Sequence, residues 1–83
     1  MDINVARIAV IGLGYVGLPL AVEFGKSRRT LGFDINSKRI SELKEGVDLT
    51  QEVSESEFRQ SSLLEFSDDS KDLINCGVYI VTV

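Results

Sequence analysis

The chain has 83 residues, of which 43% are hydrophobic and 27% charged, and this composition is that of one small globular domain. It lacks an apolar run of about 18 residues and the basic, apolar start of a signal peptide, so we expect a cytoplasmic protein without a transmembrane helix or a membrane partner. Its net charge of −4 and its scattered basic residues argue against nucleic acid as a partner.

The first predicted element is a strand over residues 6–11, which are nearly all apolar, as in a central parallel strand covered on both faces. It runs into Gly12, Gly14 and Gly17, which have the G-x-G-x-x-G spacing, and a helical pattern follows over residues 15–26. In a dinucleotide-binding turn the first glycine permits the tight turn, the second lets the backbone approach a pyrophosphate, and the third lets the helix pack on the strand. The N–H groups at the start of the helix then face the anion.

A second predicted strand, over residues 30–34, ends at Asp34, about 20 positions after Gly12, which is the spacing of a ribose-binding carboxylate in such folds. A carboxylate there accepts hydrogen bonds from both ribose hydroxyls and repels a 2′-phosphate, so the sequence predicts NAD rather than NADP. Arg39 complicates this prediction, because an arginine nearby accommodates the 2′-phosphate in NADP enzymes. Two plainer interpretations stay open: Asp34 as a cap of the next helix, and Arg39 as a solvated helix residue.

The rest of the chain continues the alternation of helices and strands. A helix that Asn36 or Ser37 can cap comes next, and residues 47–54 after it are predicted to be irregular. We then predict a helix over residues 55–60, a strand over 63–66, a helix over 68–74 and a strand over 78–83. Four strands separated by helices predict an α/β fold, a Rossmann-type doubly wound parallel sheet with strand order 3-2-1-4, truncated after the fourth strand. Because that strand leaves an open edge, we expect residues 1–83 to be the N-terminal part of a dinucleotide-binding domain, with the central and C-terminal substrate domains absent.

Two segments carry a more specific signal than the glycines alone: Gly-Leu-Gly-Tyr-Val-Gly-Leu-Pro-Leu-Ala from Gly12, and Gly-Phe-Asp-Ile-Asn from Gly32 with Arg39 behind it. Together with the closing strand, they resemble the N-terminal NAD-binding domain of the UDP-glucose/GDP-mannose dehydrogenase family. Residues 46–53 read Gly-Val-Asp-Leu-Thr-Gln-Glu-Val, where members acting on UDP-glucose or GDP-mannose usually carry a Glu-Pro-Gly segment. This run looks more like the UDP-N-acetylhexosamine (glucosamine/galactosamine) 6-dehydrogenase branch. A solvated loop without information on the substrate is the alternative interpretation.

The resemblance implies an NAD-dependent oxidoreductase that oxidises the C6 alcohol of a UDP-sugar, here a UDP-N-acetylhexosamine, to a uronic acid for polysaccharide biosynthesis. The oxidation passes through a thioester on a cysteine and reduces two NAD. The positions that match the family's cofactor site are Gly12, Gly14, Tyr15, Val16, Gly17, Asp34 and Arg39. Among them the backbone of Tyr15 and Val16 faces the pyrophosphate, Asp34 binds the adenosine ribose and Arg39 flanks the adenine end. We expect the full-length protein to bind a nucleotide-sugar substrate and to form a homo-oligomer.

No catalytic or metal-binding residue is expected in this chain. The family's catalytic cysteine and lysine belong to segments beyond Val83, so this fragment alone should be inactive. With no histidine and Cys76 as its single cysteine, the chain has no metal site or disulfide of its own, and we interpret Cys76 as a buried structural thiol.

Two other functions share the glycine turn and the acidic residue: a nucleotide-sensing Rossmann regulatory module, and another NAD-dependent dehydrogenase such as a 3-hydroxyacid type. The Tyr-Val-Gly-Leu-Pro segment argues against both.

Overall fold

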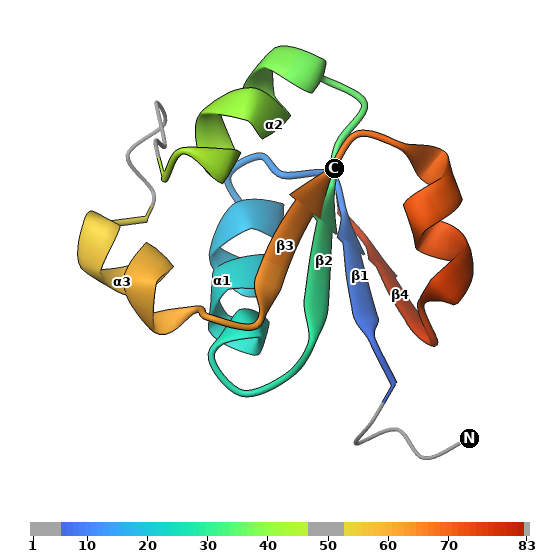
Figure 1. Ribbon diagram of the computed structural model, residues 1–83, viewed down its shortest axis with the longest axis horizontal. Helices are drawn as coiled ribbons and strands as arrows, with labels where there is room; N and C mark the ends of the chain where they lie inside the picture. The colour runs from blue at the N-terminus through green and yellow to red at the C-terminus, as the bar shows by residue number, and fades with distance from the viewer. Residues whose placement is uncertain (1–5, 47–52, 83) are drawn as a thin grey trace.

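Strands and helices alternate through most of residues 6–46 and 53–82, the part of the chain that the computed structural model describes (Figure 1). The strands are β1 (Ile8–Ile11), β2 (Thr30–Phe33), β3 (Leu64–Ser67) and β4 (Val78–Val81). The helices are α1 (Gly17–Gly25), α2 (Ser37–Lys44), α3 (Glu55–Gln60) and the 3₁₀ helix η1 (Ser70–Asn75). These elements follow the predicted order, and α3 has the predicted bounds. Residues 47–52, which make up most of the irregular stretch and of the run on which the predicted substrate branch rests, lie outside the described residues.

The strands form one sheet in the order β3-β2-β1-β4, and all neighbouring pairs are parallel, which confirms the predicted strand order. In the register of this sheet, Ile8 of β1 lies opposite Thr30 of β2 and Val78 of β4. β2 is buried along its whole length, as expected of an inner parallel strand, whereas alternate residues of β4 are exposed. Because the strands are parallel, their carboxyl ends meet at one edge of the sheet, which is where ligands bind in open α/β folds.

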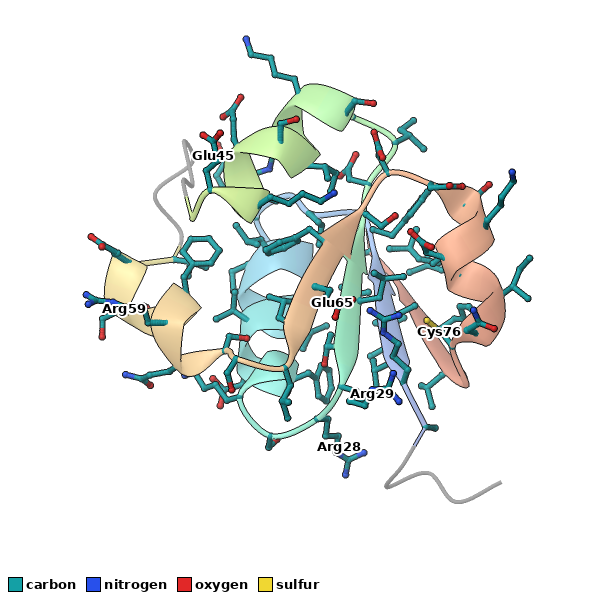
Figure 2. All side chains as sticks on the ribbon, in the orientation of Figure 1. Arg28, Arg29, Glu45, Arg59, Glu65 and Cys76 are labelled. Carbon is teal, nitrogen blue, oxygen red and sulfur yellow. The ribbon has the colours of Figure 1, made fainter. Side chains whose placement is uncertain are left out.

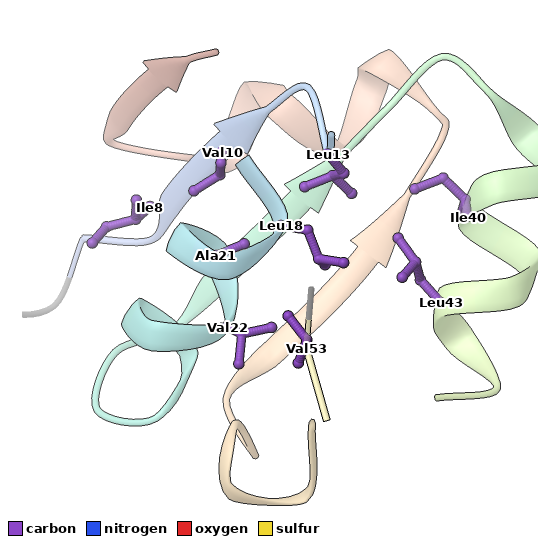
Figure 3. Close-up of a cluster of buried hydrophobic side chains, with 9 residues drawn as sticks. All are labelled: Ile8, Val10, Leu13, Leu18, Ala21, Val22, Ile40, Leu43 and Val53. Carbon is purple, nitrogen blue, oxygen red and sulfur yellow. The ribbon is translucent and has the colours of Figure 1, made fainter. Parts of the chain in front are cut away.

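The main hydrophobic core lies between the sheet and the helices α1 and α2 (Figure 3). Its buried members are Ile8, Val10, Leu13, Leu18, Ala21, Val22, Ile40, Leu43 and Val53. Burying a valine, leucine or isoleucine side chain in this way contributes about 1.5–3 kcal/mol. The core therefore anchors β1, the start of α1 and the inner face of α2, which are the elements around the glycine turn.

The opposite face of the sheet carries η1 and a smaller cluster of Ala9, Leu31 and Cys76 (Figures 1 and 2). Cys76 is 8% exposed, and its Sγ lies 3.8 Å from the Asp72 carbonyl oxygen, which confirms the interpretation of a buried thiol. Burial raises the pKa of the Cys76 thiol above its ordinary value.

This raised pKa predicts slow alkylation of Cys76. Only the thiolate reacts, and a higher pKa leaves less thiolate at a given pH. Cys76 is also buried, so the reagent reaches its sulfur less often, and iodoacetamide should modify Cys76 more slowly at about pH 8 than in the unfolded chain. The rate should rise as the pH is raised further. Mass spectrometry of the Cys76 peptide, from native and guanidinium-unfolded protein, measures the ratio. Equal rates in the two states would contradict a protected thiol.

The ends of the helices follow local side-chain chemistry. Of the two predicted caps of α2, the structure uses Asn36, whose Oδ1 accepts the N–H of Arg39 at 3.1 Å. The helix predicted over residues 68–74 is instead the 3₁₀ helix η1, whose cap is Asp69. None of the described helices is long and apolar enough to cross a membrane.

Candidate cofactor-binding site

The glycine turn joins the end of β1 to the start of α1. Gly12 has a φ of +95°, which L side chains rarely adopt, and a Cβ there would lie 2.6 Å from the Thr82 carbonyl oxygen. A Cβ on Gly17 would lie 1.6 Å from the Gly12 carbonyl oxygen, because the first turn of α1 packs directly on the backbone that leaves β1. The structural roles predicted for the first glycine, in the tight turn, and for the third, in close packing, are therefore confirmed.

Gly14 faces open space at the start of α1. A Cβ built on Gly14 would meet no atom of the described residues within 4 Å, and the neighbouring Tyr15 and Val16 are 72% and 62% exposed. Val16 is the N-cap residue of α1, and no side chain in the described part of the chain caps it with a hydrogen bond. Leu18 already donates its N–H to the Gly14 carbonyl oxygen, and Pro19 has no N–H to offer. The N–H groups of Tyr15, Val16 and Gly17, at the positive end of the helix dipole, therefore form a surface that suits an anion.

Asp34 follows β2 and ties it to the glycine turn. Its Oδ2 accepts the N–H of Leu13 at 2.9 Å, and its Oδ1 accepts the N–H of Asn36 at 3.0 Å. The residue that caps α2 is Asn36, so the interpretation of Asp34 as a plain helix cap is wrong. A carboxylate oxygen can accept two hydrogen bonds and this side chain is only partly buried, so each oxygen keeps capacity for a ribose hydroxyl.

Arg39 reaches from the first turn of α2 back to the glycine turn. Its Nη2 and Nε donate to the carbonyl oxygen of Leu13 at 2.8 and 3.2 Å. It is half-buried, so its interpretation as a solvated helix residue is also wrong. Leu13 is consequently held at both of its backbone polar groups, the N–H by Asp34 and the C=O by Arg39.

Thr82, directly after β4, holds the other flank of the turn and was not among the predicted site residues. Its Oγ1 donates to the Gly12 carbonyl oxygen at 2.6 Å, and its N–H donates to the Ile11 carbonyl oxygen at 2.8 Å. The sheet register is the signal that could have identified it. Because Ile11 pairs with Val81, the residues that follow these two parallel strands lie side by side.

The site has the parts that a dinucleotide requires. A parallel sheet in the order β3-β2-β1-β4, a glycine turn that leads into the exposed start of α1, and a carboxylate after the neighbouring strand together define a dinucleotide-binding domain of the Rossmann type.

Comparison with known proteins identifies the family to which this dinucleotide-binding domain belongs. Residues 6–83 match the UDP-glucose/GDP-mannose dehydrogenase family, NAD binding domain, and the chain belongs to this family. NAD is therefore the dinucleotide of this domain, as predicted. Membership of this family favours the dehydrogenase over the nucleotide-sensing module and over other NAD-dependent dehydrogenases.

Individual relatives agree with the predicted branch. The chain is 56% identical over 81 residues to the UDP-N-acetyl-D-glucosamine 6-dehydrogenase of Salmonella typhi, and this match covers 98% of the chain and 19% of that protein. It is 57% identical over 77 residues to the protein of the same name from Pseudomonas aeruginosa, and this match covers 93% of the chain and 18% of that protein. The structure of a UDP-D-ManNAc dehydrogenase from Pyrococcus horikoshii has a TM-score of 0.82 at 32% identity, and covers 93% of this chain and 20% of that one. The chain thus spans about a fifth of the length of these relatives.

Proposed function

We propose that this chain forms the NAD-binding portion of an enzyme that oxidises the C6 alcohol of a UDP-N-acetylhexosamine to the uronic acid. The observation that carries the proposal is the placement of Gly14, the exposed start of α1 and the Asp34 carboxylate at one edge of the sheet. Identities of 56% and 57% to two UDP-N-acetyl-D-glucosamine 6-dehydrogenases support the substrate class. When bound, NAD supplies the hydride acceptor for the oxidation of the sugar carbon.

Each part of the site suits one part of the cofactor. The N–H groups of Tyr15 and Val16, at the positive end of α1, bind the pyrophosphate, and the missing side chain of Gly14 lets it approach. Asp34 accepts hydrogen bonds from the adenosine ribose with the lone pairs that its two backbone contacts leave over. Arg39 flanks the adenine end. A 2′-phosphate would bring negative charge against the Asp34 carboxylate, so the site prefers NAD to NADP.

The covalent chemistry belongs to other parts of the full-length enzyme. Cys76 precedes β4, so it lies toward the amino end of the sheet, whereas the glycine turn and Asp34 lie at the carboxyl end. We propose that residues 1–83 are the N-terminal part of the dinucleotide-binding domain, and that the catalytic cysteine and lysine lie in the substrate domains. Relatives about five times as long support this division.

The proposal extends to the location, the oligomeric state and the biosynthetic role of the full-length protein. It acts in the cytoplasm as a homo-oligomer in polysaccharide biosynthesis and takes its nucleotide sugar from solution. Light scattering during size-exclusion chromatography tests the oligomer. A panel of nucleotide sugars, followed by the absorbance of NADH, tests the substrate; reduction of two NAD for each UDP-N-acetylhexosamine is the expected result.

Replacing Asp34 tests the cofactor site itself. We expect calorimetry of the full-length protein to show tighter binding of NAD than of NADP. Asp34→Ala should weaken NAD binding by about 1–3 kcal/mol, because hydrogen bonds from the ribose to a charged acceptor are lost. The preference for NAD over NADP should shrink at the same time, because the repulsion of the 2′-phosphate is lost too.

Asp68→Ala is the matched control, since Asp68 is an exposed carboxylate that follows the neighbouring strand β3. It should leave both affinities unchanged. An Asp34→Ala protein that is folded and binds NAD as tightly as the wild type would contradict the assignment of Asp34 to the ribose.

A further inference from the structure

Leu13, between the first two glycines, has both backbone polar groups bound by side chains from other elements. Asp34 accepts its N–H at 2.9 Å, and Arg39 donates to its carbonyl oxygen from Nη2 at 2.8 Å and from Nε at 3.2 Å. The Leu13 side chain is buried in the main core with 1% exposure. The backbone is therefore fixed immediately before Gly14, where the chain turns toward the start of α1.

Arg39 is itself held firmly enough to act on the turn. Its N–H donates to the cap side chain of Asn36 at 3.1 Å, which fixes it in the first turn of α2. The next residue, Ile40, is 2% exposed and Leu43 is 1% exposed, so α2 is anchored in the main core. The guanidinium thus connects a helix fixed by packing to the carbonyl group of a loop, through two charge-assisted hydrogen bonds.

We propose that Arg39 is a positioning residue for the cofactor, which fixes the Leu13–Gly14 peptide and thereby presents the N–H groups at the start of α1 to the pyrophosphate. This inference rests on the proposed function, because it concerns the same site. It differs from a direct contact with the adenine or with a 2′-phosphate. Such a contact acts only in the bound state, whereas a positioning contact orders the turn before any nucleotide arrives.

Hydrogen exchange of the full-length protein without nucleotide separates the two roles. The informative peptide covers residues 12–18, because Leu13 donates its N–H to Asp34 and Leu18 donates its N–H to the Gly14 carbonyl oxygen at 3.2 Å. In Arg39→Met this peptide should exchange about tenfold faster than in the wild type, because the loop opens locally more often. Peptides from α3 and β3 should keep their rates, which shows that the variant is folded.

Two further variants isolate the cause. Lys38→Met removes an exposed cation from the same turn of α2 and should change neither exchange nor NAD affinity. Arg39→Lys keeps the charge but replaces the planar fork with a single ammonium group, so exchange in residues 12–18 should stay faster than in the wild type. Calorimetry should show NAD and NADP weakened by the same factor, about tenfold in Arg39→Met and less in Arg39→Lys.

Three results would overturn the proposal: unchanged exchange in Arg39→Met, full recovery of NAD affinity by Arg39→Lys while exchange in residues 12–18 stays fast, or a loss confined to NADP. The first would leave Arg39 as a direct ligand, the second as a simple positive charge, and the third as a 2′-phosphate contact. The exchange measurement needs no nucleotide, so it stands even if the full-length protein fails to bind NAD. That failure would instead count against the proposed function.

Discussion

Gly17→Ala is expected to destabilise the domain by at least about 3 kcal/mol, which is the upper end of the cost of forcing an extra methyl group into a packed site. The added Cβ would lie 1.6 Å from the carbonyl oxygen of Gly12 and 2.6 Å from Thr82 Oγ1. The Gly12 carbonyl cannot rotate away cheaply, because it accepts the hydrogen bond from that threonine hydroxyl. The start of α1 must therefore move off β1, and the buried contacts of Leu18 with the main core loosen with it.

Thermal unfolding of the full-length protein, with hydrogen exchange of the β1 and α1 peptides, measures this loss. Gly14→Ala is the matched control, because it adds the same methyl group two positions after Gly12, where no atom that the structure describes lies within 4 Å. It should change stability by less than about 1 kcal/mol. If Gly17→Ala melts at the wild-type temperature with unchanged exchange, then helix and strand do not pack through this glycine.

The sequence was informative where local pattern and burial agree. The apolar run at the start became the buried strand β1, and the polar stretch before α3 ends in Ser54, whose Oγ accepts the N–H of Glu57 at 3.2 Å. Such a cap is a local signal for the residue at which a helix begins, which accounts for the agreement in the bounds of α3. The spacing from Gly12 to Asp34 was equally readable, since one helix and one strand of fixed lengths bring the two residues to the same edge.

The contacts that order the glycine turn could not be read from the sequence in the same way. Thr82 and Gly12 are 70 positions apart, and their contact depends on the register of β4 against β1. Arg39 was assigned from its distance along the chain, but the direction of its side chain, toward Leu13, follows from how α2 packs on the core. Spacing identifies which residues approach the turn, and packing decides which atoms they touch.

The helix after β3, η1, differs from its prediction because of hydrogen bonds between residues that are close in the sequence. The hydroxyl of Ser67 accepts the N–H of Asp69 at 3.0 Å and donates to the Asp72 carboxylate at 2.5 Å. Asp69 in turn accepts the N–H of Lys71 at 3.0 Å. These short-range bonds compete with α-helical ones, so the segment starts later than predicted and forms 3₁₀ turns.

Gly14→Val is expected to raise the dissociation constant for NAD about 100-fold, because each hydrogen bond from an N–H group to the charged pyrophosphate contributes about 1.5–3 kcal/mol and about 1.4 kcal/mol is a factor of ten. The side chain would project into the space beside the exposed start of α1, where the pyrophosphate is proposed to lie. The fold should tolerate the change, since no atom among residues 6–46 and 53–82 lies within 4 Å of the new Cβ and the backbone of Gly14 is outside the left-handed region.

Calorimetric titration with NAD, together with circular dichroism and thermal unfolding, separates the effects on binding and on fold. Gly46→Ala is the comparison variant, because a Cβ there also meets nothing within 4 Å in the described part of the chain but lies at the end of α2, away from the turn. Its φ of +78° makes alanine strained, so it should lower stability by about 1 kcal/mol and leave NAD affinity unchanged. We expect Gly14→Val to bind NAD more weakly at unchanged stability, and Gly46→Ala to be less stable at unchanged NAD affinity. This pair of results would show that the open space beside Gly14 is occupied by NAD and that the space beside Gly46 is not. Wild-type affinity in a folded Gly14→Val protein would place the pyrophosphate elsewhere, and the uncapped helix end would then be a feature of the turn alone.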